Sequence, residues 1–308
     1  MTYAYPLDDV SGVSDGLSER SPFRPSREQP ALWPSVFSDE RARRDSEAVE
    51  APAANRYTLL RELGQALHDD SLGLHLQAIA NPADGRIAGY EALLRWPNEH
   101  RGLLLPNQFL PYAESSGLIV AIDRWVLRHA ADHLRFWRRN GYDGWLAVNV
   151  SARSLEDPTY LDDIRTLAKA APEIRGHVRL ERTESSVIQK PESARACLAA
   201  VKALGIGVAI DDFGKGFTAL GQLTQLDFDQ IKIDAGLLRG VGVNPQAEAI
   251  VRSVLYLGRN IGVDVVAEGI ESEAQRAWLA AEGGTLAQGF LLAEPTPMES
   301  VDPRATLV

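Results

Sequence analysis

Cysteine is almost absent from this chain, since Cys197 is the one cysteine among 308 residues. A single thiol excludes a disulfide within the chain, and it excludes zinc and iron–sulfur sites that are built from several cysteines. Chains without a disulfide framework are typical of reducing compartments. We therefore expect a cytoplasmic location.

Long apolar runs are also missing. Stretches such as residues 118–122 have the length of a strand or a helical turn, far short of the roughly 20 residues that span a bilayer. Residues 1–9 contain neither the basic region nor the apolar core of a secretory signal. We expect no association with a membrane.

Positive charge is in the minority, with 32 Lys and Arg against 42 Asp and Glu and a formal net charge of −10. Proteins that coat nucleic acid usually present basic surfaces, so we expect no nucleic-acid polymer as a partner. A small anionic ligand is still compatible with this balance, because bound metal ions can reverse the sign of a local site.

Apolar periodicity is absent from residues 1–55, which hold six of the 17 prolines. Such a segment cannot bury enough surface to offset the entropy of ordering it, so we expect a disordered tail over 1–55 and a folded domain over 56–308. Leu32, Trp33, Val36 and Phe37 form one apolar patch in this tail. The patch either docks on the domain or on a protein partner, or it is a scatter of apolar residues in a loose tail.

Short apolar runs alternate with amphipathic stretches after residue 56. We expect strands at residues 72–80, 86–94, 145–149, 177–183, 208–212, 230–233, 263–267 and 285–287, and helices at 122–140, 161–170, 193–204, 247–261 and 272–282. Helices between strands imply right-handed crossovers and a parallel sheet. The turn sequence at 81–85 instead joins the first two strands as an antiparallel hairpin. The pattern predicts an α/β fold, a modified TIM (β/α)8 barrel with one antiparallel strand, with a doubly wound open sheet as the alternative.

Polar side chains recur at the carboxyl ends of these expected strands, which converge on one face of a barrel. They are Glu91, Asn149, Glu181, Glu184, Asp211, Asp212, Lys232, Asp234, Glu268, Glu271 and Gln288. Clustered carboxylates raise each other's pKa values unless a cation lies among them, and oxygen ligands favour Mg²⁺ or Mn²⁺. Two such ions are a recurrent device for phosphodiester hydrolysis. The residues therefore indicate a two-metal hydrolase of a phosphate ester.

Each of these residues also has an ordinary structural interpretation. Asp211 and Asp212 could cap the helix that follows, Lys232 could be the partner in a buried ion pair, and Asn149 could be a turn residue. The hydrolase hypothesis depends on seven strand ends that share the same polar character.

Seven ordered motifs carry a family resemblance. They are Glu91-Ala-Leu-Leu-Arg-Trp96, Val148-Asn-Val-Ser-Ala-Arg153, Glu181-Arg-Thr-Glu184, Asp211-Asp-Phe-Gly214, Lys232-Ile-Asp234, Glu268-Gly-Ile-Glu271 and Gln288-Gly289. From about residue 58 to 298 the chain closely resembles the EAL-domain family of cyclic di-GMP phosphodiesterases. The resemblance implies a modified TIM barrel, usually dimeric, that opens cyclic di-GMP to linear pGpG with two Mg²⁺ or Mn²⁺ ions.

The resemblance also implies roles for individual residues. One metal ion would be held by Glu91, Asn149, Glu181 and Asp211, and the second by Asp211, Asp212 and Glu268. Lys232 would orient and help activate the attacking water, so the catalytic set is Lys232, Glu91, Asp211, Asp212 and Glu268. The residues implied on the substrate side are Gln77, Leu93, Arg95 and Gln288, and those implied to brace the loop after the Asp pair are Glu184 and Glu271.

Some positions depart from the family pattern. Leu76 and Ala78 stand where the family usually has Tyr and Pro, and Arg182 stands at an apolar position, on the outward face of its strand, where it needs a partner or must reach solvent. Lys215 stands where a small residue is expected, and Ala235 replaces a frequent Arg. None of these changes removes an implied metal ligand or catalytic group.

Two other functions stay open at this point. The chain could be a cyclic di-GMP receptor that is catalytically weak or inactive and signals through a protein partner. It could also be a barrel hydrolase that acts on a different phosphodiester.

Overall fold

The structure is a computed structural model, and it describes residues 53–184, 191–215, 226–304 and 307. The expectations for residues 1–52, including the patch at 32–37, lie outside the described residues. The first described element is helix α2 (Ala53–His68), which begins before the expected domain start at residue 56.

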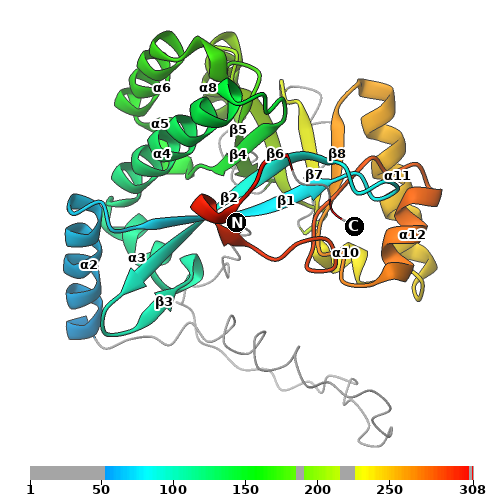
Figure 1. The fold of residues 1–308 in the computed structure, drawn as a ribbon, viewed down its shortest axis with the longest axis horizontal. Coiled ribbons are helices and arrows are strands. Elements are labelled where there is room, and N and C mark those ends of the chain that lie inside the picture. Colours follow the sequence, from blue (N-terminus) through cyan, green and yellow to red (C-terminus); the bar gives the residue numbers. More distant parts are fainter. Residues whose placement is uncertain (1–52, 185–190, 216–225, 305–306, 308) are drawn as a thin grey trace, which may run out of the picture.

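Eight strands close into a barrel (Figure 1). Around it the order is β1 (Gly73–Ala80), β2 (Ile87–Asn98), β4 (Trp145–Asn149), β5 (Val178–Thr183), β6 (Gly207–Phe213), β7 (Gln230–Ile233), β8 (Asp264–Ala267) and β9 (Leu286–Ala287), which pairs with β1 again. Strand β1 runs antiparallel to both of its neighbours, and the other neighbouring pairs are parallel. The predicted modified TIM barrel with one reversed strand is confirmed, and the open-sheet alternative is wrong.

Two short strands lie outside this closed ring. Strand β3 (Gly102–Leu104) pairs with the far end of β2, and β10 (Thr296–Pro297) pairs with β1. Neither was expected from the sequence, because runs of two or three residues carry no readable alternation.

Helices pack outside the barrel strands. They are α3 (Pro106–Ser116), α4 (Ile119–Arg139), α5 (Ala152–Glu156), α6 (Pro158–Ala170), α8 (Pro191–Ala203), α10 (Ala235–Leu238), α11 (Pro245–Ile261) and α12 (Glu273–Ala281), with short 3-10 turns η1 (Pro172–Ile174) and η2 (Met298–Ser300). Every helix expected from the sequence overlaps one of these. A search of the described residues for a helix with the length and apolarity to cross a membrane found none.

Alternation along the strands separates the helix-facing core from the barrel interior. In β4, Leu146 and Val148 belong to the large core shared with the helices. Trp145 and Ala147 instead belong to a small apolar cluster with Ile79, Val266 and Leu286. Gly89 makes room for this cluster, since a Cβ on it would lie 2.4 Å from the Trp145 ring. Apolar side chains therefore fill one layer of the barrel interior.

A polar layer lies two residues further along the same strand faces. Because side chains repeat every two residues, the next inward positions after the apolar layer lie at the active face of the barrel; in the reversed strand β1 the corresponding position precedes that layer. They are Gln77, Glu91, Asn149, Glu181, Asp211, Lys232, Glu268 and Gln288. Strand periodicity thus places the residues of the sequence motifs on the interior faces of their strands, and closure of the barrel brings them together.

Candidate active site

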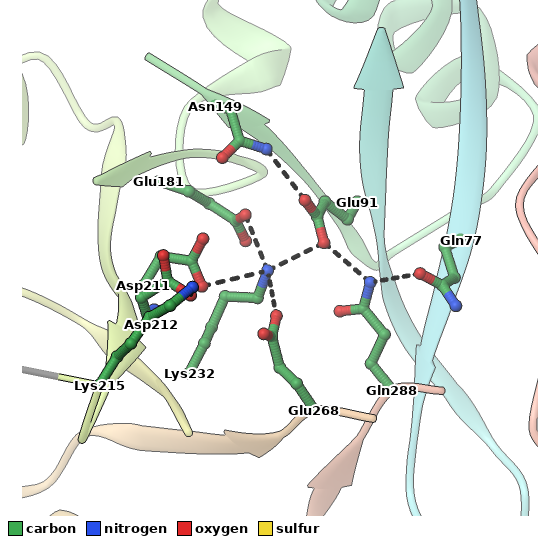
Figure 2. Close-up of polar contacts among 10 residues, drawn as sticks. All are labelled: Gln77, Glu91, Asn149, Glu181, Asp211, Asp212, Lys215, Lys232, Glu268 and Gln288. Carbon is green, nitrogen blue, oxygen red and sulfur yellow. Dashed lines mark hydrogen bonds and ion pairs between the residues drawn. The ribbon is translucent and has the colours of Figure 1, made fainter. Parts of the chain in front are cut away.

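The Lys232 ammonium lies at the centre of this polar layer (Figure 2). Its Nζ is 2.9 Å from Glu91 Oε2, 2.8 Å from Glu181 Oε2 and 2.7 Å from Glu268 Oε1. Asp211 Oδ1 is further away, at 3.9 Å. The Lys232 side chain is fully buried. Lys232 is therefore in buried ion pairs, which was the structural alternative for this residue. Its partners are the four carboxylates that the sequence motifs had singled out.

Glu91 accepts hydrogen bonds from amide side chains on both sides of it in the polar layer. Asn149 Nδ2 donates to Glu91 Oε1 at 2.9 Å, and Gln288 Nε2 donates to Glu91 Oε2 at 2.8 Å. Gln288 Nε2 also donates to Gln77 Oε1 at 2.9 Å, and Gln77 in turn donates to the carbonyl of Ala293. These amides fix the rotamer of the Glu91 carboxylate, and Figure 2 shows the chain of contacts.

The end of β6 turns two successive carboxylates toward the cluster. The register with β7 shifts between Ile210 and Phe213, and Asp212 adopts φ +59°, in the left-handed region that a non-glycine residue rarely occupies. Asp211 and Asp212 are both buried as a result. Strain of this kind persists where the surroundings demand it, and it clusters at functional sites.

The loop after this bulge is held by two contacts. Gly214 N donates to Glu184 Oε2 at 3.0 Å, and Lys215 N donates to the carbonyl of Asp212 at 3.1 Å. The Lys215 ammonium lies 3.6 Å from Asp212 Oδ1.

Burial and crowding change the protonation of the cluster. Burial raises the pKa of Glu268 to about 7, with a further increase from Asp211 and an opposing decrease from Lys232. Burial and the Asp211 charge likewise raise the pKa of Asp212 to about 7. Burial by itself would lower the pKa of Lys232, but the charges of Asp211, Glu181 and Glu268 hold it well above its usual value. Lys232 is therefore a permanent cation, whereas two of the acids are poised to lose their protons near neutrality.

The donor set fits divalent cations. Four buried oxygens of this cluster have no hydrogen-bond partner within the described residues: Glu181 Oε1, Asp211 Oδ2, Asp212 Oδ1 and Gln288 Oε1. Four carboxylates surround the buried Lys232 ammonium and a fifth, Asp212, is buried next to Asp211, so acidic groups outnumber the buried cation. Within the described ranges, no group of three or more Asp, Glu, His or Cys side chains is arranged to hold a metal ion. Figure 2 shows that Lys232 Nζ lies between the carboxylates. The carboxylates would therefore have to turn toward a bound cation. Carboxylate oxygens are the ligands that Mg²⁺ and Mn²⁺ prefer.

The remaining predicted site residues lie around this cluster or apart from it. Leu93 is buried on the same face of β2 as Glu91, and Arg95 follows two residues later, where its Nη1 donates to the Leu94 carbonyl at 2.9 Å. Glu271 is exposed, and its backbone N–H donates to Gln275 Oε1. The carboxylate of Glu271 has no hydrogen bond or ion pair in the described chain, so its bracing role stays a prediction.

A buried carboxylate that the motifs did not single out supports the loop after β4. Asp123, on α4, accepts hydrogen bonds from Ser151 N at 2.8 Å and from Ser154 Oγ at 2.7 Å. Burial raises the pKa of Asp123 to about 6, against the opposing effect of these bonds. Asp123 lies on the buried, apolar face of α4. A charged residue at such a position in the sequence is unusual, and this feature could have identified Asp123 before the structure was known.

Arg182 was expected either to have a partner or to reach solvent, and it has a partner. Its side chain is 4% exposed and does not reach solvent; Nη1 donates to the Ser151 carbonyl at 3.2 Å. Its Nε has no hydrogen-bond partner in the described part of the chain. Burial lowers the pKa of Arg182 to about 10.

The fold and the site together define a TIM-like barrel with a cluster of buried acidic residues around a buried lysine. A family profile described as the EAL domain matches residues 60–295. The chain belongs to the EAL domain family, as the sequence motifs predicted.

Proteins named as cyclic di-GMP phosphodiesterases are similar to most of this chain. The bifunctional diguanylate cyclase/cyclic di-GMP phosphodiesterase MucR of Pseudomonas aeruginosa is 38% identical over 255 residues, covering 82% of this chain and 37% of MucR. The cyclic di-GMP phosphodiesterase PdeR of Escherichia coli is 35% identical over 235 residues, covering 76% of this chain and 35% of PdeR. The chain thus spans little more than a third of the length of these relatives.

One solved structure is matched over almost its whole length, unlike the two relatives above. The PaMucR phosphodiesterase in complex with cyclic di-GMP superimposes with a TM-score of 0.75 and 39% identity, covering 79% of this chain and 98% of that one. The architecture is therefore that of an EAL domain.

Proposed function

We propose that this protein hydrolyses cyclic di-GMP to linear pGpG by a metal-dependent attack of water on one phosphodiester bond. The observation that carries the proposal is the convergence of four carboxylates on one buried ammonium, with the buried Asp212 next to them and with Glu181 Oε1 and Asp211 Oδ2 left without a hydrogen bond in the described structure. The four are Glu91, Glu181, Asp211 and Glu268. The names of MucR and PdeR, and the ligand in the PaMucR complex, support cyclic di-GMP as the substrate.

Two Mg²⁺ or Mn²⁺ ions are the implied cofactors. Glu91, Asn149, Glu181 and Asp211 would hold one of them, and Asp211, Asp212 and Glu268 the other. Bound there, the ions would supply Lewis-acid stabilisation of the phosphate and an acidified water.

The chain's own residues orient and stabilise the reacting groups. Lys232 keeps its proton, so its charge would stabilise developing negative charge, and it takes no proton itself. Its three N–H groups face Glu91, Glu181 and Glu268, so an N–H released by one of these carboxylates would orient the attacking oxygen. Asn149 and Gln288 hold Glu91 in one orientation through their amide N–H groups. Gln77 accepts a hydrogen bond from Gln288 and extends the polar layer, and we propose that it contacts the substrate.

A cyclic di-GMP receptor without turnover is the competing function. Product analysis separates the two. The full chain is incubated with cyclic di-GMP and Mn²⁺, and linear pGpG is followed by chromatography beside Glu91→Gln, which removes a charge without changing shape. We expect product from the native chain and a loss of at least about 100-fold in Glu91→Gln. Binding without product would overturn the enzyme and favour the receptor.

We also infer that the domain forms a homodimer through α11. Exposed apolar side chains on or beside this helix include Ile250 at 45%, Tyr256 at 66% and Ile261 at 50% exposure. A groove of about 500 Å³ between α11 and Phe213 makes this surface continuous with the end of β6. A second copy of the chain would bury this surface, and Tyr256→Lys should then shift the mass in solution toward the monomer.

A further inference from the structure

The Asp212 carboxylate is set apart from the other four acids by its cationic partner. Lys232 Nζ lies within 4 Å of Glu91, Glu181, Asp211 and Glu268. Among the described ion pairs Asp212 has none with Lys232, and its partner is the Lys215 ammonium at 3.6 Å. Two lysines therefore divide the acidic cluster between them.

The two lysines differ in how firmly they are held. Lys232 is fully buried in a barrel strand. The Lys215 side chain is 43% exposed, whereas that of Asp212 is 7% exposed. Lys215 can therefore leave Asp212 for solvent, but Lys232 has no such exit.

The local backbone keeps Lys215 beside Asp212. The residues lie three apart in a turn closed by the bond from Lys215 N to the Asp212 carbonyl, and Glu184 anchors Gly214 inside that turn. The left-handed φ of Asp212 turns its carboxylate inward, toward the cluster. The contact follows from the shape of the turn, so it forms whenever the side chain extends along it.

We propose that Lys215 is a built-in competitor for the divalent cation that Asp212 would hold. This inference rests on the proposed metal-dependent function. The ammonium supplies Asp212 with a positive charge when no ion is bound, and it must move into solvent when a divalent ion takes its place. A chain with Lys215 therefore binds its second ion more weakly than one with a neutral residue there, while the first ion is little affected.

Metal binding, measured apart from turnover, tests this. The full chain is titrated with Mn²⁺ alone, and free Mn²⁺ is read from its electron paramagnetic resonance signal. Lys215→Gln removes the charge at similar length, and Lys215→Arg keeps it. Lys169→Gln, at an exposed position of α6, is the matched control for net charge. Circular dichroism verifies that each variant is folded.

We expect Lys215→Gln to bind the weaker of two Mn²⁺ ions about fivefold more tightly, the effect of an exposed ion pair near 1 kcal/mol. Lys215→Arg and Lys169→Gln should match the native chain. The gain should shrink at high salt, because an exposed charge is screened. Equal affinities in the native chain and Lys215→Gln, with two ions bound in each, would overturn the inference alone. No Mn²⁺ binding by the native chain would overturn it together with the proposed metal site.

Discussion

Lys232 Nζ lies 2.8 Å from Glu181 Oε2, and both side chains are shielded from solvent. The two residues come from β7 and β5 and are 51 positions apart, so only the closed barrel brings them together. A buried pair of this kind contributes little relative to apolar packing, but removing one partner leaves an uncompensated charge. The site's electrostatics and the stability of the barrel are thereby linked.

Removing the central cation should be costly to folding and to turnover. We expect Lys232→Met to lower the free energy of unfolding of the metal-free protein by about 3–5 kcal/mol, because four carboxylates lose their counter-ion. Turnover should fall by at least about 100-fold. Urea unfolding and product formation measure the two effects. Lys202→Met is the control, since Lys202 pairs with Asp227 and Asp229 near the surface. A stability loss no larger than in this control would contradict the assignment.

The raised pKa of Glu268 predicts a pH dependence in the absence of metal. Its pKa rises from 4.5 to about 7 through burial, so between these values the folded state holds a proton that the unfolded state has lost. Stability from this group is therefore fully present below about pH 4.5 and is lost as pH rises to about 7. We expect the native chain to lose about 1–3 kcal/mol relative to Glu268→Gln over this interval. A difference that stays flat or grows with pH, in urea unfolding with chelator present, would refute the shift.

The buried carboxylate of Asp123 should matter as an acceptor more than as a charge. Asp123→Ala leaves Ser151 N and Ser154 Oγ without their acceptor and should cost about 2–3 kcal/mol. Asp123→Asn keeps an acceptor oxygen and removes the cost of a buried charge, which is present at pH 7 because the pKa is about 6. We expect it to stay within about 1 kcal/mol of the native chain. Equal losses in both variants, by urea unfolding, would argue against the acceptor role.

Arg182 is expected to be dispensable for stability. Its hydrogen bond to the Ser151 carbonyl is long, at 3.2 Å, and its Nε has no hydrogen-bond partner in the described structure. Replacing such a buried charge by an apolar side chain of similar volume is often neutral or stabilising. Thermal unfolding of Arg182→Leu should therefore match or exceed that of the native chain. A loss of more than about 2 kcal/mol would show that the guanidinium is well compensated in its pocket.

Strand positions were predictable where burial is continuous and turns bound the run. Both β4 and β7 match their expected limits of 145–149 and 230–233. β4 is largely an apolar run, whereas β7 alternates, with Ile231 and Ile233 as its apolar residues. Helix α2 was not predicted, because Ala53–His68 mixes polar and apolar residues with little periodicity and follows a proline-rich segment. Its packing against α3 and α4 supplies the order that its own sequence does not.

The membership of the site was predictable, but its contacts were not. Strand periodicity and converging strand ends are enough to place Glu91, Asp211 and Glu268 on one face. That Lys232 reaches four carboxylates depends on closure of the barrel, which no local pattern encodes. The pairing of Lys215 with Asp212 depends on a left-handed residue at a bulge, and the pair Asp-Asp gives no sign of it.

Hydrolysis in ¹⁸O-labelled water tests the central claim most directly. The protein is incubated with cyclic di-GMP and Mn²⁺, and the product is weighed by mass spectrometry, with Asp211→Asn as the matched variant that keeps side-chain shape. Water attack on one phosphodiester predicts linear pGpG with a single ¹⁸O in its terminal phosphate, formed only with the metal and not by Asp211→Asn. Recovery of intact cyclic di-GMP from the native chain, or of a product without the label, would contradict the account.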